Sequence, residues 1–207
     1  MHDPTVAAYN AAIDLLLYVH HTNHTHLHFS GSTTAHPGIP QSHHAHIALN
    51  HGLMAYSDAS WHKPDSLGFN MFGHVVYLFG GPISFASKHL KVVALSSAEA
   101  EYAAASYTCK EIMFVRQVCA ELGVVLTGPT VLAVDNEAAI KIARNIGVMG
   151  RNKHFQDSLH FFRHLYDHQI VDPVYVTTKN QRADGFTKAL PPSLFGPWFN
   201  GLVSRRV

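Results

Sequence analysis

The chain has 207 residues, of which 47% are apolar and 14% are charged, and its formal net charge is +1. Soluble domains carry roughly 25% charged residues, so the composition excludes a highly charged, disordered chain, and the length suits one domain with an extension, or two small ones. No apolar run approaches the length of a membrane span, and no secretory signal is evident. We therefore expect a soluble, intracellular protein.

Histidine and basic residues are distributed unevenly. Eleven of the 18 histidines lie in the first 51 residues, and no lysine or arginine precedes Lys63. From Lys141 to the C-terminus there are ten basic and four acidic residues, an excess of six. A basic segment suits a polyanionic partner, although a solvated surface explains most such segments. Cys109 and Cys119 fall on one predicted helix, too far apart to form a disulfide, which fits a reducing compartment.

The first 50 residues predict a helix, a strand and a loop. Asp3 and Pro4 suit the start of a helix, and apolar residues recur at helical spacing to about Val19. Residues 24–29 alternate like a half-buried strand, with His24, His26 and His28 on one face. These histidines match no structural zinc pattern, and an exposed polar strand is the simpler interpretation. Gly, Ser, Thr, Pro and His cluster over residues 30–50, which predicts a loop or linker.

The rest of the chain alternates between strand and helix patterns. Three strands with tight turns are expected at residues 53–58, 72–79 and 83–87. A long helix follows, opened by Ser96 or Ser97 with Glu99 and closed by Gly123. After it we expect a strand at 131–134, helices at 136–144 and 153–167, a strand at 174–177 and a helix at 183–189. This order predicts an α/β fold whose mixed five-stranded sheet, first antiparallel and then parallel, is flanked by helices.

Two aspartates directly follow apolar strand patterns. Asp58 ends the first strand of this region and Asp135 ends the fourth. In α/β sheets, polar residues at the carboxyl ends of strands face the crevice where ligands bind. An acid is costly to bury there unless a charge neutralises it, although a single strand-end aspartate is more often a turn or helix cap.

Two further acids fall on predicted helices. Glu99 and Glu101 are two residues apart, about 200° around a helix, so at most one faces the sheet. Glu101 lies nearer the apolar stripe, whereas Glu99 suits a capping box with Ser96. Asp184 begins the helix after the last strand, where an acid also favours the helix dipole.

Four carboxylates brought together would repel one another unless they held divalent cations, and oxygen ligands suit Mg²⁺ or Mn²⁺. Two such ions about 4 Å apart can activate a water and stabilise the leaving oxygen of a phosphoryl displacement. The sequence therefore predicts a two-metal nuclease centre. Its expected catalytic and metal-binding residues are Asp58, Glu101, Asp135 and Asp184.

Six ordered blocks between residues 53 and 200 resemble one family. They are residues 56–61, 80–88, 93–102, 134–140, 153–154 and 183–191. Together they are similar to the ribonuclease H domain at the C-terminus of copia-type retrotransposon polyproteins. The resemblance implies a ribonuclease H-like fold and a metal-dependent endonuclease that cuts the RNA strand of RNA/DNA hybrids, leaving 5′-phosphate and 3′-hydroxyl ends. It assigns the family's four acids to the same four residues.

The resemblance extends to residues 1–50, which are similar to the end of the reverse transcriptase that precedes this domain. No polymerase catalytic motif is present. We therefore expect an N-terminal segment at 1–50, a ribonuclease H-like domain at 51–190 and a C-terminal tail at 191–207. The implied partners are an RNA/DNA hybrid and the reverse transcriptase portion of the parent polyprotein, with no membrane. The expected location is the cytoplasm, including virus-like particles, with the nucleus left open.

Basic residues near the third and fourth acids are candidates for phosphate contacts, which give affinity without sequence preference. An A-like hybrid would be distinguished by its minor groove and 2′-hydroxyls. Any single lysine or arginine is more often a solvated surface residue. The expected substrate-binding residues are Arg151, Lys153, His154, Arg182 and Lys188.

The chain departs from the family at three places. Residues 61–73 lack the usual Arg/Lys-Ser-Thr-Ser-Gly run, and no histidine stands in the loop before Asp184. Gly185 replaces an aliphatic residue and would loosen a helix by up to ~1 kcal/mol. Two alternatives therefore stay open: a non-catalytic, hybrid-binding remnant of a degenerate element, and another phosphoryl-transfer enzyme of the same fold, such as an integrase or exonuclease.

Overall fold

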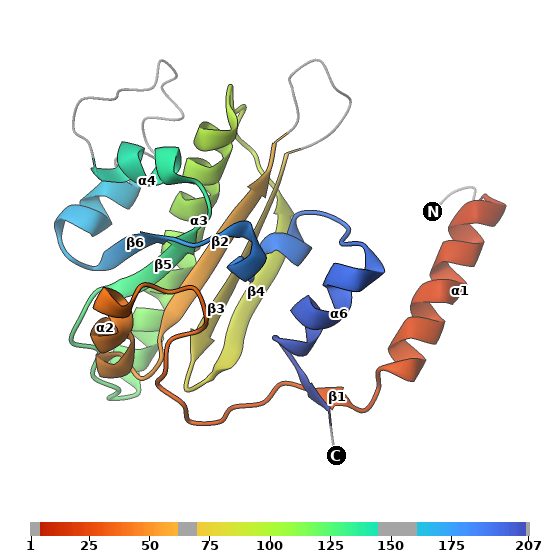
Figure 1. The fold of residues 1–207 in the computed structure, drawn as a ribbon, viewed down its shortest axis with the longest axis horizontal. Helices are drawn as coiled ribbons and strands as arrows, with labels where there is room; N and C mark the ends of the chain where they lie inside the picture. The colour runs from red at the N-terminus through yellow and green to blue at the C-terminus, as the bar shows by residue number, and fades with distance from the viewer. Residues whose placement is uncertain (1–4, 62–69, 145–160, 206–207) are drawn as a thin grey trace.

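A computed structural model gives the structure of the chain and describes residues 5–61, 70–144 and 161–205 (Figure 1). At its centre lies a five-stranded sheet with the strand order β4-β3-β2-β5-β6. The strands are β2 (Met54–Ser60), β3 (Met71–Leu78), β4 (Gly81–His89), β5 (Thr130–Val134) and β6 (Val171–Tyr175). Strands β2, β3 and β4 pair antiparallel, whereas β5 pairs parallel with both β2 and β6. The predicted mixed sheet of the ribonuclease H-like fold is confirmed.

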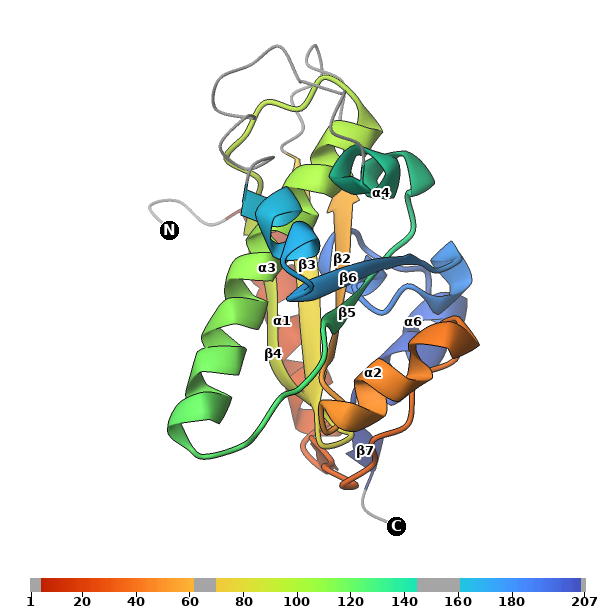
Figure 2. The same cartoon turned by 90° about the vertical axis from the view of Figure 1, so that its left-hand side faces the viewer.

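The central strand β2 is buried on both faces because each face carries an apolar core. Ala55 faces the core beneath α3 (Ser97–Glu121), whereas Met54 and Tyr56 face the core on the opposite side. Small residues along the inner side of α3, mostly alanines, are fully buried and let the helix lie close to the sheet. Helix α4 (Glu137–Arg144) packs beside α3. Figure 2 shows α3 and α2 (His44–Leu49) on opposite sides of the sheet.

The N-terminal helix α1 (Val6–His21) stands apart from the sheet, and none of its residues is buried. It begins after Thr5, whose Oγ1 accepts a hydrogen bond from the Ala8 N–H at 3.2 Å; the predicted cap, Asp3 with Pro4, lies outside the described residues. The strand expected at 24–29 is reduced to β1 (Thr25–His26), which pairs with β7 (Ser204–Arg205). Within the described ranges, no helix combines the length and apolar character needed to cross a membrane.

The sequence prediction was wrong in two further segments. Residues 30–50, expected to be a loop, contain the short 3₁₀ helix η1 (Gln41–His43) and α2. Only two apolar side chains in this histidine-rich stretch, Ile39 and Ile47, are buried in the second core, so its helical pattern was weak. The helix expected at 183–189 is a single 3₁₀ turn, η3 (Asp184–Phe186), and the helix lies further on, as α6 (Pro192–Asn200).

The remaining helix expected after α4 is described in part. Residues 161–167 are helical, whereas the predicted start at residue 153 lies outside the described residues. The division of the chain at residues 50 and 190 stays a prediction.

Candidate metal centre

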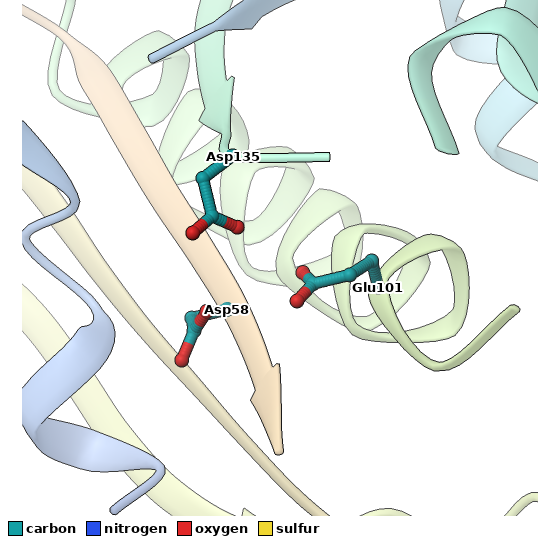
Figure 3. A group of neighbouring side chains, drawn as sticks. All are labelled: Asp58, Glu101 and Asp135. Carbon is teal, nitrogen blue, oxygen red and sulfur yellow. The ribbon is translucent and has the colours of Figure 1, made fainter. Parts of the chain in front are cut away.

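Three of the four predicted acids converge at one edge of the sheet. Asp58 comes from β2, Glu101 from the first turns of α3, and Asp135 directly follows β5. One carboxylate oxygen from each lies within 4.8 Å of the other two, and the side chains point toward one another (Figure 3). The convergence follows from the topology, because β2 and β5 are adjacent and parallel, so their carboxyl ends meet at the same edge.

The two glutamates of α3 are arranged as predicted. Glu99 accepts a hydrogen bond from the Leu95 N–H at 2.8 Å, and its own N–H donates to Ser96 Oγ at 3.2 Å, which closes the helix N-terminus. Glu101 points inward and is only 6% exposed. The inner face of the helix therefore supplies a carboxylate to the cluster, and the outer face supplies the cap.

Two hydroxyl groups that sequence reasoning missed orient the aspartates. Thr187 donates a hydrogen bond to Asp58 Oδ2, and Thr178 donates to Asp135 Oδ2 at 2.9 Å. Thr178 and Thr187 follow the last strand of the sheet, so the segment that closes the fold also fixes both strand-end carboxylates. The sequence held little signal for this, because a lone threonine in a loop has many ordinary uses.

Asp184 lies beside the three-carboxylate cluster rather than within it. It is 8% exposed and sits on η3, where its Oδ1 lies 2.5 Å from the Nζ of Lys188. The turn reaches the sheet because Gly73, the register partner of Asp58 on β3, has no side chain. A Cβ at Gly73 would lie 2.5 Å from the Cβ of Phe186.

The three carboxylates lie close together, so their negative charges favour the binding of either protons or cations. Burial, together with the charges of Asp58 and Asp135, raises the pKa of Glu101 to about 9. Burial and the neighbouring carboxylates Asp135 and Asp184 raise the pKa of Asp58 to about 6. The pKa of Asp135 is also raised, mainly by burial. Among the described residues Glu101 Oε2 has no hydrogen-bond partner. An oxygen-only donor set with an unpartnered buried oxygen fits a hard divalent cation.

Two of the five predicted substrate-binding residues lie in the described part of the chain. Lys188 is half exposed and forms an ion pair with Asp184. Its partial burial lowers the pKa of its ammonium group, but the nearby carboxylates outweigh this effect and raise the pKa. The guanidinium of Arg182 lies against Gly201, at the end of α6, and its charge, after burial, helps to lower the pKa of His36 to about 4. The other three, Arg151, Lys153 and His154, lie outside the described residues.

Replacing Lys188 with methionine would test whether this lysine is an internal counter-ion. Asp184 would lose its ion pair while staying mostly buried, so we expect the metal-free protein to lose about 1 kcal/mol of stability. That loss lowers the melting temperature by roughly 2–4 °C. Thermal unfolding in chelator is the measurement, and Lys141→Met, which removes an exposed pair with Glu137, is the control. Unchanged stability with weaker hybrid binding would mean that Lys188 serves in substrate contact alone and not as a counter-ion of Asp184.

Comparison with known proteins places this arrangement in context. No family model matches the chain. The "Retrovirus-related Pol polyprotein from transposon RE1" of Arabidopsis thaliana is 39% identical over 145 residues, covering 69% of this chain and 10% of that protein. Transposon RE2 of the same plant gives 37% over 138 residues (67% and 10%), and transposon TNT 1-94 of Nicotiana tabacum gives 32% over 143 residues (69% and 11%).

This chain is a homologue of retrovirus-related Pol polyproteins from transposons. The resemblance inferred from the six sequence blocks is thereby confirmed. The chain spans about a tenth of the length of these Pol polyproteins.

Similar solved structures are ribonucleases H of low sequence identity. LC11-RNase H1 in complex with an RNA/DNA hybrid has a TM-score of 0.47 and 14% identity, covering 65% of this chain and 92% of that one. RNase H1 from Halobacterium salinarum gives 0.42 and 18% over 65% and 92%. An N-terminal RNase H domain from Mycobacterium tuberculosis gives 0.45 and 11% over 72% and 97%. The strand order and carboxylate geometry described above stand independently of these scores.

Proposed function

We propose that this homologue of the Pol polyproteins is a metal-dependent endonuclease of the ribonuclease H type. Its substrate would be the RNA strand of RNA/DNA hybrids formed during reverse transcription of a retroelement. The observation that carries the proposal is the convergence of Asp58, Glu101 and Asp135 within 4.8 Å at the carboxyl edge of a mixed sheet. Repelling carboxylates that a fold nevertheless buries together indicate a cation-dependent function rather than a structural one.

The residues that would hold the metal follow from the geometry. One Mg²⁺ or Mn²⁺ would be bound by Asp58, Glu101 and Asp135. Asp184 would leave its ion pair with Lys188 and, together with the neighbouring carboxylates, would complete a second cation site. Bound metal would polarise the scissile phosphate and lower the pKa of a water. The chain's own contribution would be to hold the carboxylates in place: Thr187 orients Asp58, and Thr178 orients Asp135.

Phosphate recognition would fall to basic residues near the site. Arg182 and Lys188 lie two residues before and four after Asp184, while Arg151, Lys153 and His154 lie outside the described residues. Contacts of this kind would give affinity that falls with increasing salt. The reverse transcriptase portion of the parent polyprotein is the proposed protein partner.

Cleavage of defined substrates tests the proposal. With Mg²⁺ or Mn²⁺, the purified chain should cut a hybrid labelled on its RNA strand, leaving 5′-phosphate ends, and should leave duplex DNA and single-stranded RNA intact. A chelator should abolish cleavage, and added metal should restore it.

Each other outcome would contradict the proposal in a different way. Hybrid binding without cleavage would favour a non-catalytic remnant, and cleavage of DNA would favour an integrase- or exonuclease-like activity. A control ribonuclease H in parallel would exclude a defective substrate.

A further inference from the structure

Helix α6 contacts the turn that carries Asp184 through one tryptophan. The indole Nε1 of Trp198 donates a hydrogen bond to the backbone oxygen of Arg182 at 2.8 Å. The same indole lies directly against Gly185, where a Cβ would come within 2.5–2.7 Å of three indole carbons. Its ring also meets that of Phe186 edge-on, with centroids 5.2 Å apart. Trp198 therefore contacts the chain on both sides of Asp184.

The turn η3 needs such support more than the other three acid-bearing segments do. Asp58 and Asp135 belong to paired strands of the sheet or directly follow one, and Glu101 sits on a helix of 25 residues. Asp184 instead sits on a 3₁₀ turn of three residues, and such short turns have poor hydrogen-bond geometry. Gly185 adds further backbone freedom to this turn. Side chains that place a metal ligand correctly are themselves held by a surrounding layer of contacts.

Gly185 allows the indole of Trp198 to lie against the turn. In the sequence it departed from the aliphatic residue usual in the family, and it was expected to loosen a helix. The structure has no helix there; the missing side chain leaves the space that the indole occupies. Phe186, on the other side of the turn, stacks on Phe85 of β4, with centroids 5.9 Å apart. The turn is thus held between α6 and the sheet.

We propose that Trp198, seated on Gly185, is a positioning residue that sets the place of Asp184 beside the carboxylate cluster and so tunes the affinity for the second divalent cation. The inference rests on the proposed metal-dependent function. It also predicts that the C-terminal segment, expected from the sequence to be only a tail, is part of the working site.

The test compares Trp198→Ala with Phe199→Ala in the full chain. Phe199 lies on the same helix, but its ring stacks on that of Phe195 and meets that of Tyr18 edge-on, so its loss controls for reduced apolar packing of α6. Amide hydrogen exchange over residues 183–188 should speed up at least tenfold in Trp198→Ala and change little in Phe199→Ala. Affinity for Mn²⁺, titrated directly, should fall about tenfold in Trp198→Ala alone.

Conservative variants sharpen the result. Trp198→Phe keeps a ring against Gly185 but loses the N–H donor, so it should recover part of the Mn²⁺ affinity, whereas Gly185→Ala should displace the indole and behave like Trp198→Ala. Equal exchange rates in Trp198→Ala and Phe199→Ala would overturn the positioning role, whether or not the wild-type chain cleaves a hybrid. If exchange is faster in Trp198→Ala while the wild-type chain binds Mn²⁺ but cuts no hybrid, the positioning role is retained and the nuclease is rejected.

Discussion

Replacing Asp135 with asparagine is expected to reduce hybrid cleavage at least ~100-fold without unfolding the protein. The substitution removes one of the three carboxylates that lie within 4.8 Å of one another, and with it a full negative charge that would hold the cation. Shape is preserved, because the amide oxygen of asparagine can still accept the hydrogen bond from Thr178. The melting temperature in chelator should be equal to or above that of the wild type, since a repulsion is lost.

Cleavage rates at saturating Mg²⁺ and thermal unfolding are the two measurements for this variant. Asp167→Asn is a matched control, because Asp167 is an exposed acid on the helix at residues 161–167. It should keep full activity. If Asp135→Asn were as active as the wild type, Asp135 would not be a catalytic residue. If its melting temperature fell sharply, the loss of activity would be uninformative, and the Mg²⁺ affinity of the folded fraction would decide instead.

The sheet and long helix could be predicted because local patterns and topology agree there. Apolar runs that end in Asp58 and Asp135 are typical of strands buried on both faces, and the stripe along α3 distinguished Glu101 from Glu99. Parallel pairing of β2 and β5 then brings three acids together from positions far apart in sequence. This part of the site depends only on the backbone, which is why the sequence sufficed.

The position of the fourth acid, Asp184, could not be predicted, because it depends on which side chains Asp184 contacts and a sequence pattern does not distinguish between them. Asp184 and Lys188 are four residues apart, a spacing that allows an ion pair, but the same aspartate could equally face the cluster. Residues 191–207 are expected from the sequence to be a tail, whereas Pro192 opens α6 and Trp198 of this helix packs on Phe186 of η3. Tertiary contacts, rather than local propensity, decide this end of the fold.

Replacing Glu101 with glutamine is expected to stabilise the metal-free protein at pH 8. Glu101 has a folded-state pKa of about 9 against an ordinary value of 4.5, so the folded chain binds this proton more tightly than the unfolded chain does. The stability from Glu101 is therefore full below about pH 4.5 and is lost as the pH rises through 9. Glutamine carries no such penalty, so we expect a gain of about 1–3 kcal/mol at pH 8, or roughly 2–4 °C per kcal/mol.

The same Glu101→Gln variant distinguishes the effect of repulsion between the buried carboxylates from the effect of metal binding. Mg²⁺ should raise the melting temperature of the wild type at pH 8, because the cation replaces the missing proton, and should raise that of Glu101→Gln much less. Glu99→Gln is the matched control, since it changes the outward glutamate that caps α3 and should give no gain in chelator. If Glu101→Gln were instead less stable than the wild type in chelator at pH 8, the buried carboxylate would have a stabilising partner of its own. The case for a cation at this edge of the sheet would then fail on energetic grounds, because the folded protein would already neutralise the charge that the metal is proposed to balance.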